Sequence, residues 1–196
     1  MPLLKHNEHY TYSDYCTWDD GKRWELIDGI PYLMSPAPSP IHQQISVKLA
    51  WQLQNFLNEK PCKLFTAPFD VRLNADDEDD IVVQPDLVVI CDNAKIDDKG
   101  CKGAPDLAIE ILSPSTARTD RVLKFQRYQR ARVQEYWIVD PETKSVQVCT
   151  LNEHGQYVAL AYADTDIVPV EVLPGCVINL QEIFVQDNQS NENDNN

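Results

Sequence analysis

The sequence predicts one α/β domain, and three observations support this expectation. Residues 39–60 repeat apolar side chains at the spacing of an amphipathic helix. Residues 81–90 and 104–112 are runs rich in β-branched and aliphatic residues, with the length of buried strands. No stretch changes composition in the manner of a linker, and 196 residues suit one hydrophobic core. We therefore expect a single domain over residues 1–185, followed by a disordered polar tail at 186–196.

The first part of the chain combines a hairpin with the clearest helix. Residues 11–18 suit a short helix with a Thr or Ser cap. Residues 23–34 predict two short strands around an Asp-Gly pair, because Asp-Gly favours the tight turn of a hairpin. The helix over 39–60 carries its apolar residues on one stripe, and Pro61 ends it.

The middle of the chain is expected to form strands separated by loops. Residues 62–73 alternate well enough for a strand. The acidic run "DDEDD" at 76–80 is expected to be a solvated loop. Residues 81–90 then form one buried strand, and 92–103 form a loop that leads to the second buried strand.

The last third returns to a helix and then to strands. The sequence "SPST" offers caps for a helix that runs to about residue 131. Residues 135–140 and 145–151 flank a Pro-containing turn and predict a hairpin. Residues 155–163 and 176–180 add further strands.

Composition argues against membrane and secreted classes. No apolar run approaches the roughly 20 residues that span a bilayer. The first residues lack the basic and apolar regions of a secretory signal, so we expect a cytoplasmic protein that does not bind membranes. The six cysteines form no Cys-x-x-Cys pair and lie near no histidine at the spacing of a zinc site. We expect all six to be free thiols.

The charge of the chain is unevenly distributed. The formal net charge is -14, which on average repels nucleic acid. Residues 118–132, however, hold six of the 17 Lys and Arg residues and one acid. Four arginines of this segment could hold a phosphate backbone, namely Arg118, Arg121, Arg127 and Arg130. They cannot all face one groove, because each step of three along a helix drifts by about 60°. We assign nucleic-acid binding to the first three.

Two carboxylates stand where buried strands need apolar residues. An ionised carboxylate is costly at Asp86 or Glu110 unless a cation, a hydrogen-bond network or a metal compensates it. Asp106 lies on the strand of Glu110, but at roughly 3.3 Å per residue their Cα atoms are about 13 Å apart, too far to share one Mg²⁺. Neighbouring strands are about 4.8 Å apart, so Asp86 on an adjacent strand is the better partner for Glu110. Two carboxylates completed by waters are a usual Mg²⁺ site for chemistry on phosphates.

Lys124 complements the two acids. It lies at the centre of the helix that follows Glu110, and such a helix tends to pack back over its sheet. A lysine at that place can orient a water and stabilise the charge that develops on a phosphate. Asp86, Glu110 and Lys124 together therefore favour a site for chemistry on phosphates that uses Mg²⁺, with Mn²⁺ as a substitute.

Six segments, taken in order, resemble one known family. They are "RWELIDG", "SPIHQQIS", "QPDLVV", "GAPDLAIEILSPST", "RVLKFQRY" and "EYWIVDPE", and the resemblance covers most of residues 11–184. Their order and spacing are similar to the Uma family of restriction-endonuclease-like proteins, a branch of the PD-(D/E)XK nuclease superfamily. The resemblance implies a restriction-endonuclease-like fold, in which helices flank a mixed central β-sheet. It also implies a Mg²⁺-dependent phosphodiesterase site.

The resemblance also implies roles for individual residues. By motif position, Asp86 matches the first acid and Glu110 the second, and Ile111 would offer its backbone carbonyl to the metal. Glu25 matches the glutamate that precedes the core. The chain departs from the superfamily at Leu112, where a lysine is usual, and the family pattern moves that lysine to the following helix, which here means Lys124.

Each of these residues also has a structural interpretation. Asp86 could cap a loop, Glu25 could pair with a basic neighbour across the hairpin, and Lys124 could extend its charge to solvent from a half-buried face. His42 could approach the site, but a hydrogen-bonded histidine at a helix start is the simpler interpretation. Tyr128 suits core packing, and the arginines suit a solvated face.

Three functions are compatible with these patterns. The first is a Mg²⁺-dependent endonuclease that acts on DNA as a homo-oligomer, with a dimer as the expected form. The second is a non-catalytic module that binds nucleic acid or protein, favoured by Leu112 and by the acidic net charge. The third is a glycosidase, which needs two acids about 5–9 Å apart and for which the sequence supplies no aromatic sugar platform.

Overall fold

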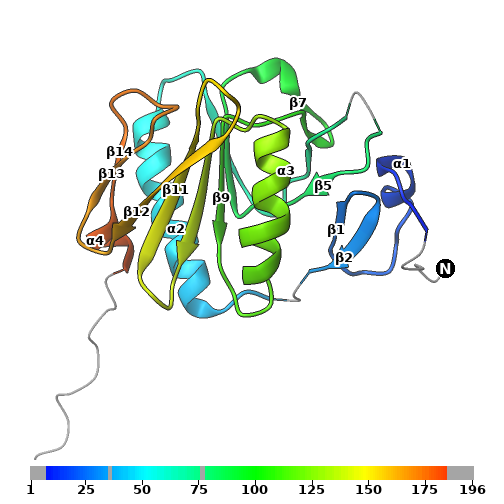
Figure 1. Cartoon of the computed structure of the whole chain (residues 1–196), viewed down its shortest axis with the longest axis horizontal. Coiled ribbons are helices and arrows are strands. Elements are labelled where there is room, and N and C mark those ends of the chain that lie inside the picture. Colours follow the sequence, from blue (N-terminus) through cyan, green and yellow to red (C-terminus); the bar gives the residue numbers. More distant parts are fainter. Residues whose placement is uncertain (1–7, 35–36, 76–77, 185–196) are drawn as a thin grey trace, which may run out of the picture.

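A six-stranded mixed sheet forms the centre of the molecule (Figure 1). The structure is a computed structural model, and it describes residues 8–34, 37–75 and 78–184. The strand order is β12-β11-β10-β9-β6-β3. Its strands are β3 (Lys63–Thr66), β6 (Leu87–Ile90), β9 (Leu107–Ile111), β10 (Glu135–Asp140), β11 (Ser145–Leu151) and β12 (Tyr157–Ala163). β9 and β10 are parallel and the other neighbours are antiparallel, which confirms the expected mixed sheet.

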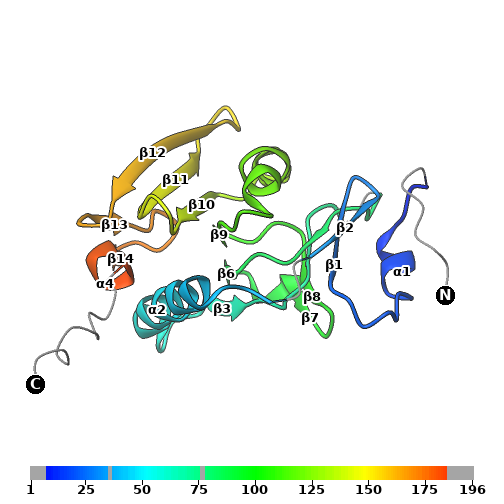
Figure 2. The same ribbon diagram turned by 90° about the horizontal axis from the view of Figure 1, so that it is seen from below.

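A second six-stranded sheet has the order β2-β1-β5-β4-β8-β7. Its strands are β1 (Trp24–Ile27), β2 (Ile30–Leu33), β4 (Val71–Arg72), β5 (Val82–Val83), β7 (Ile96–Asp97) and β8 (Gly100–Lys102). A separate pair consists of β13 (Ile167–Pro169) and β14 (Val177–Asn179). The second sheet lies beside the central sheet, with β1 and β2 on its outer side next to α1 (Figure 2).

Helices cover both faces of the central sheet. The helical elements are α1 (Tyr12–Tyr15), α2 (Pro40–Leu57), the 3₁₀ turn η1 (Asn93–Lys95), the π-helix η2 (Thr119–Lys124), α3 (Phe125–Arg130) and α4 (Leu180–Phe184). The buried stripe of α2 shares one apolar cluster with Leu107 and Ile109. Tyr128 of α3 shares the other cluster with Ala108 and Leu112. Since successive strand residues point to opposite faces, Glu110 lies on the same face as Ala108 and Leu112, which is the face that α3 covers.

The hairpin of β1 and β2 forms where the Asp-Gly pair predicts it. Asp28 and Gly29 both have positive φ, at 54° and 70°, as the mirror-image turn of a hairpin requires. Ile27 pairs with Ile30, so the turn contains these two residues alone. The turn fixes the register that sets Glu25 opposite Tyr32.

The expected strand over 81–90 is in fact two strands in two sheets. β5 pairs with β1 and β4, whereas β6 pairs with β3 and β9, and the chain turns between them over 84–86. The single strand expected over 62–73 is likewise divided into β3 and β4. The loop expected over 92–103 contains η1, β7 and β8. Propensity marks an extended chain correctly but cannot show at which residue it changes sheet.

Two expectations about polar residues and cysteines are wrong. Cys62 and Cys91 form a disulfide, because β3 and β6 are paired neighbours and bring residues 29 apart in sequence together. The acidic run is not wholly solvated, since Asp80 is buried and accepts a hydrogen bond from Asn74 Nδ2 at 2.6 Å. Residues 76–77 of that run, and the tail predicted at 186–196, lie outside the described residues. No helix of the described chain is long and apolar enough to cross a membrane.

Candidate active site

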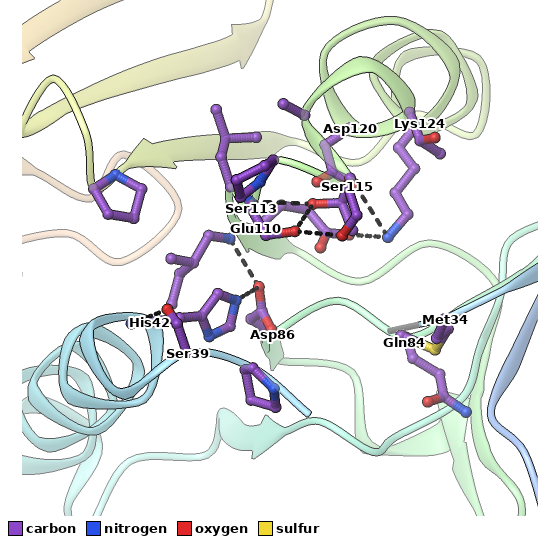
Figure 3. Close-up of a pocket in the computed structure, with 18 of the residues that line it drawn as sticks. Met34, Ser39, His42, Gln84, Asp86, Glu110, Ser113, Ser115, Asp120 and Lys124 are labelled. Carbon is purple, nitrogen blue, oxygen red and sulfur yellow. Dashed lines mark hydrogen bonds and ion pairs between the residues drawn. The ribbon is translucent and has the colours of Figure 1, made fainter. Parts of the chain in front are cut away.

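A pocket of about 1040 Å³ opens at the end of the central sheet where β9 ends (Figure 3). Its walls come from the end of β2, the start of α2, the segment before β6 and the start of the helix after β9. The predicted residues Glu25, Asp86, Glu110 and Lys124 all line it. Ile111 lines it as well, so the structure brings together the five residues that the sequence assigned to catalysis and metal binding.

Asp86 and Glu110 lie near each other at the ends of two neighbouring strands (Figure 3). β6 and β9 pair antiparallel, and Leu87 opposite Ile109 is the last pair of this ladder. Asp86 and Glu110 are the next residues along the two strands, so both carboxylates lie just beyond this end of the ladder. The Ile111 N–H donates to Asp86 Oδ2 at 2.8 Å, which ties the first carboxylate to the strand of the second.

The backbone of Ile111 is directed towards Asp86. The Leu112 N–H donates to the Val139 carbonyl, so the residues on either side of Ile111 bond to β10. In a strand, the N–H and C=O of one residue point to the same side. Since the Ile111 N–H meets Asp86, the Ile111 carbonyl also points to the side on which Asp86 lies.

Lys124 lies inside a cage of three carboxylates. Its Nζ is 2.8 Å from Glu25 Oε1, 2.9 Å from Glu110 Oε1 and 3.4 Å from Asp120 Oδ1. The side chains of all four residues are buried. Tyr128 also donates its hydroxyl to Glu110 Oε1 at 2.9 Å. Lys124 therefore points to the sheet, as its position after β9 suggested, and does not extend to solvent.

The cage carries more negative than positive charge. Burial raises the pKa of Glu110 well above its ordinary value, and the Lys124 ammonium offsets only part of this effect. Burial likewise raises the pKa of Asp120. For Lys124, burial favours the neutral amine, but Glu110, Glu25 and Asp120 together raise its pKa well above the ordinary value, so the ammonium is retained. A second cation close to Glu110 would relieve the remaining excess of negative charge.

The helix that carries Lys124 begins as a π-helix. Asp120, Lys124 and Tyr128 are spaced by four residues, and all three are buried towards Glu110. Single π-type turns are frequent at functional sites. Asp120 is a site residue that was not predicted from the sequence, although the four-residue spacing from Lys124 to Tyr128, extended back by one step, points to it.

His42 is the second residue that the sequence analysis did not assign to the site. It lies in the first turn of α2 and is buried, and its Nε2 is 3.2 Å from Asp86 Oδ2. Burial lowers its pKa, but the hydrogen bond and the charge of Asp86 outweigh burial, so the net shift is upward. Nδ1 has no hydrogen-bond partner within the part of the chain that the structure describes. His42 thus holds the carboxylate of Asp86 from the side of α2 (Figure 3).

The donors present suit a Mg²⁺ ion that keeps part of its water shell. Among the described residues, Asp86 Oδ1 and Glu110 Oε2 accept no hydrogen bond, whereas the other oxygen of each carboxylate does. No group of three His, Cys, Asp or Glu side chains within the described ranges could enclose an ion. Mg²⁺ usually takes one or two carboxylates and keeps several waters, so two carboxylates and one carbonyl are sufficient.

The three predicted arginines have different surroundings. Arg121 lines the pocket and donates to Asp140 Oδ2 at 2.8 Å. Arg127 is turned away from the pocket, because its Nε donates to Asp28 Oδ1 at 2.7 Å and holds the β1–β2 turn against α3. Arg118 is exposed and does not line the pocket. Of these three arginines, only Arg121 is therefore placed to meet a phosphate beside the carboxylates.

Comparisons with known proteins identify the family and the fold of the chain. The Uma2 family model, described as "Putative restriction endonuclease", matches residues 11–181. The uncharacterized protein slr1290 of Synechocystis sp. is 28% identical over 156 residues, which are 78% of this chain and 80% of that protein. A crystal structure of a "putative nuclease belonging to DUF820" from Anabaena variabilis has a TM-score of 0.71 at 19% identity. The match covers 89% of this chain and 97% of that chain, and it confirms the nuclease-like α/β fold.

Proposed function

Because the chain belongs to the Uma2 family of restriction-endonuclease-like proteins, we propose that it is a Mg²⁺-dependent endonuclease that hydrolyses phosphodiester bonds in DNA. The observation that carries the proposal is that Asp86 and Glu110 line one pocket at the end of the sheet, where Asp86 accepts from the Ile111 N–H and the Lys124 ammonium lies 2.9 Å from Glu110 Oε1. Two carboxylates beside a buried cation are the parts that phosphodiester hydrolysis needs.

Some residues of the site would hold the metal ion, and others would place positive charge beside the phosphate. Asp86 and Glu110 would hold Mg²⁺ through their free oxygens, with the Ile111 carbonyl as a third ligand. The bound ion supplies a positive charge for the phosphate and lowers the pKa of a water molecule. Mn²⁺ would replace it. The attacking water forms the new P–O bond, and the bond to the leaving oxygen breaks on the opposite side of phosphorus.

Lys124 and Glu25 have different parts in this scheme. The Lys124 ammonium lies beside Glu110, where it can orient the attacking water and stabilise the charge that grows on the phosphate oxygens. Glu25 Oε1 accepts from both Lys124 Nζ and the Gln84 N–H, each at 2.8 Å. Glu25 thus fixes Lys124 relative to the segment that leads to Asp86, and it acts as a positioning residue.

A plasmid-nicking assay tests the proposal. We expect the wild-type chain to nick supercoiled DNA with Mg²⁺ or Mn²⁺ and not with EDTA. Glu110→Ala and Asp86→Asn should abolish nicking in both metals. If Glu110→Ala cleaves as fast as the wild type, the assignment of the site is wrong.

One observation favours a second candidate, a non-catalytic binding module on the same fold. Leu112 occupies the usual lysine position and is buried in the core, while three carboxylates hold Lys124 in place. Calorimetry with Mn²⁺ separates the two candidates. Binding that is lost in Asp86→Asn supports the nuclease, and absence of any binding by the wild type supports the module. The homodimer and the cytoplasmic location remain predictions. Light scattering tests the homodimer.

A further inference from the structure

The charge of the pocket limits the number of phosphates it can contact. Six carboxylates line it, namely Glu25, Asp86, Glu110, Asp120, Asp140 and Glu142. Three Lys or Arg residues line it, and Lys124 is already surrounded by acids. A bound divalent cation would still leave the lining with more negative than positive charge. Arg23 and Arg121 are thus the cations left to meet phosphates inside the pocket. The Arg23 side chain donates only to the neutral side chain of Gln84 among the described residues, and Arg121 is paired with Asp140 but is 42% exposed.

Two available cations are too few for the binding of a DNA duplex. Proteins that bind duplex DNA neutralise many phosphates, often about 6–10 of them, and obtain most non-specific affinity in this way. The chain as a whole has a net charge of -14, which opposes any wider contact with two phosphate backbones. Arg127 is held by Asp28, so it does not extend the basic surface towards the pocket.

One wall of the pocket is apolar. The end of β2 and the chain before and within the start of α2 contribute Tyr32, Leu33, Met34, Ala37, Pro38 and Ile41. Leu33 is 57% exposed, so a ligand in the pocket can reach its side chain. Tyr32 stands opposite Glu25 in the β1–β2 register, so its ring is on the side of the carboxylates. Such a wall can contact the faces of bases, but the bases of a duplex are stacked and cannot reach it.

We propose that the pocket takes single-stranded nucleic acid, with an unstacked base against the wall of β2 and α2 and its phosphate at Asp86 and Glu110. This inference rests on the proposed function and narrows its substrate. A volume of about 1040 Å³ is at the upper end of small-ligand sites, so it holds a short piece of one strand. Base contacts replace the phosphate contacts that the acidic surface does not provide.

The test compares one strand with its own duplex. A labelled DNA strand of about 12 nucleotides, within the usual site size for single strands, is offered alone and annealed to its complement. Cleavage is followed with Mn²⁺, and binding is followed by fluorescence anisotropy with Ca²⁺. We expect the single strand to bind at least about tenfold more tightly, the factor that stacking of one base provides, and to be cleaved faster.

Salt dependence and a matched pair of variants make the test specific. Two or three phosphate contacts predict a loss of affinity of about tenfold between 50 and 200 mM salt, not the roughly thousandfold or greater loss typical of duplex binders. Leu33→Ala should weaken single-strand binding about fourfold, the factor that one methylene group against a base corresponds to. Leu160→Ala is the control, because Leu160 is 59% exposed on β12 and does not line the pocket.

The outcomes separate this inference from the nuclease proposal. Equal or tighter binding of the duplex, or equal losses in Leu33→Ala and Leu160→Ala, overturns the single-strand inference and leaves the nuclease proposal in place. If neither substrate is cleaved, the nuclease proposal fails, and the anisotropy comparison still decides which form of nucleic acid the pocket binds.

Discussion

Replacing Glu110 with Gln should remove metal binding and at the same time stabilise the metal-free protein. Glu110 is buried with Lys124 at 2.9 Å, and two further carboxylates, Glu25 and Asp120, are already within 3.4 Å of the same ammonium. Lys124 therefore keeps two counter-ions in Glu110→Gln. The Gln side-chain carbonyl can still accept the hydrogen bonds that Lys124 and Tyr128 donate to Glu110 Oε1.

The expected gain in stability of Glu110→Gln follows from the raised pKa of Glu110. Burial raises this pKa well above 4.5, so the folded state holds the proton more tightly than the unfolded state. The contribution of Glu110 to wild-type stability is therefore highest below about pH 4.5 and falls as the pH rises towards the folded pKa of this group. Glu110→Gln has no titrating group at this position, so its stability does not fall in this way as the pH rises. Each tenfold change in the protonation equilibrium corresponds to about 1.4 kcal/mol, so we expect the variant to be more stable by about 1 kcal/mol or more at pH 8.

Thermal denaturation of the wild type and of Glu110→Gln measures this change in stability. It is carried out at pH 8 and pH 4.5, with EDTA or with Mn²⁺. In EDTA at pH 8, a gain of about 1 kcal/mol raises the melting temperature by about 2–4 °C, and the gain should shrink towards pH 4.5. With free Mn²⁺ at 100 times its Kd, the wild type should gain about 2.7 kcal/mol and the variant nothing. Glu153→Gln is the control, because it removes an equal charge from a side chain that is 86% exposed.

Two results would refute this reasoning. A loss of several kcal/mol in Glu110→Gln in EDTA would mean that Lys124 depends on Glu110 as its counter-ion and that the cage has no excess of negative charge. Equal stabilisation of the wild type and the variant by Mn²⁺ would mean that the ion does not bind at Glu110.

The remaining predictions concern the residues around the two carboxylates. Lys124→Met leaves three buried carboxylates without a cation, so urea unfolding at pH 8 should show a loss of about 3–5 kcal/mol, recovered in part at pH 5; an unchanged unfolding curve would contradict the cage. His42→Ala should weaken Mn²⁺ binding in calorimetry by about 10–100-fold, because it releases Asp86, whereas His42→Gln keeps a donor and should recover most of the affinity; equal affinities of the two variants would exclude a positioning role. Arg127→Ala should cost less than about 1 kcal/mol in urea unfolding and leave cleavage unchanged, because its ion pair with Asp28 is partly exposed and neither residue lines the pocket; loss of cleavage without loss of stability would restore Arg127 to the nucleic-acid surface.

Local patterns predicted the elements that build the site. The apolar stripe of α2, the Asp-Gly turn between β1 and β2, and the run that forms β9 are each encoded within a few residues. The cost of a carboxylate in a buried strand singled out Asp86 and Glu110, and the distance along a strand excluded Asp106. Asp106 in fact accepts a hydrogen bond from the Cys91 N–H at 2.7 Å, which is a structural role.

These local patterns could not predict the contacts between segments that are distant in sequence. The division of residues 81–90 between two sheets, the disulfide of Cys62 with Cys91, and the approach of His42 to Asp86 all join residues that are far apart in sequence. Each depends on which strand lies next to which, and no local propensity contains that information.

The sequence by itself therefore determined which residue types the site contains, because an acid in a buried strand is costly wherever the strand lies. Only the tertiary structure decided their surroundings. It showed that Lys124 is shared by three carboxylates, that Arg127 is held by Asp28, and that β2 gives the pocket an apolar wall. The physical reason is that the energy of a charge depends on the distances to all its neighbours, and those distances exist only once the chain has folded.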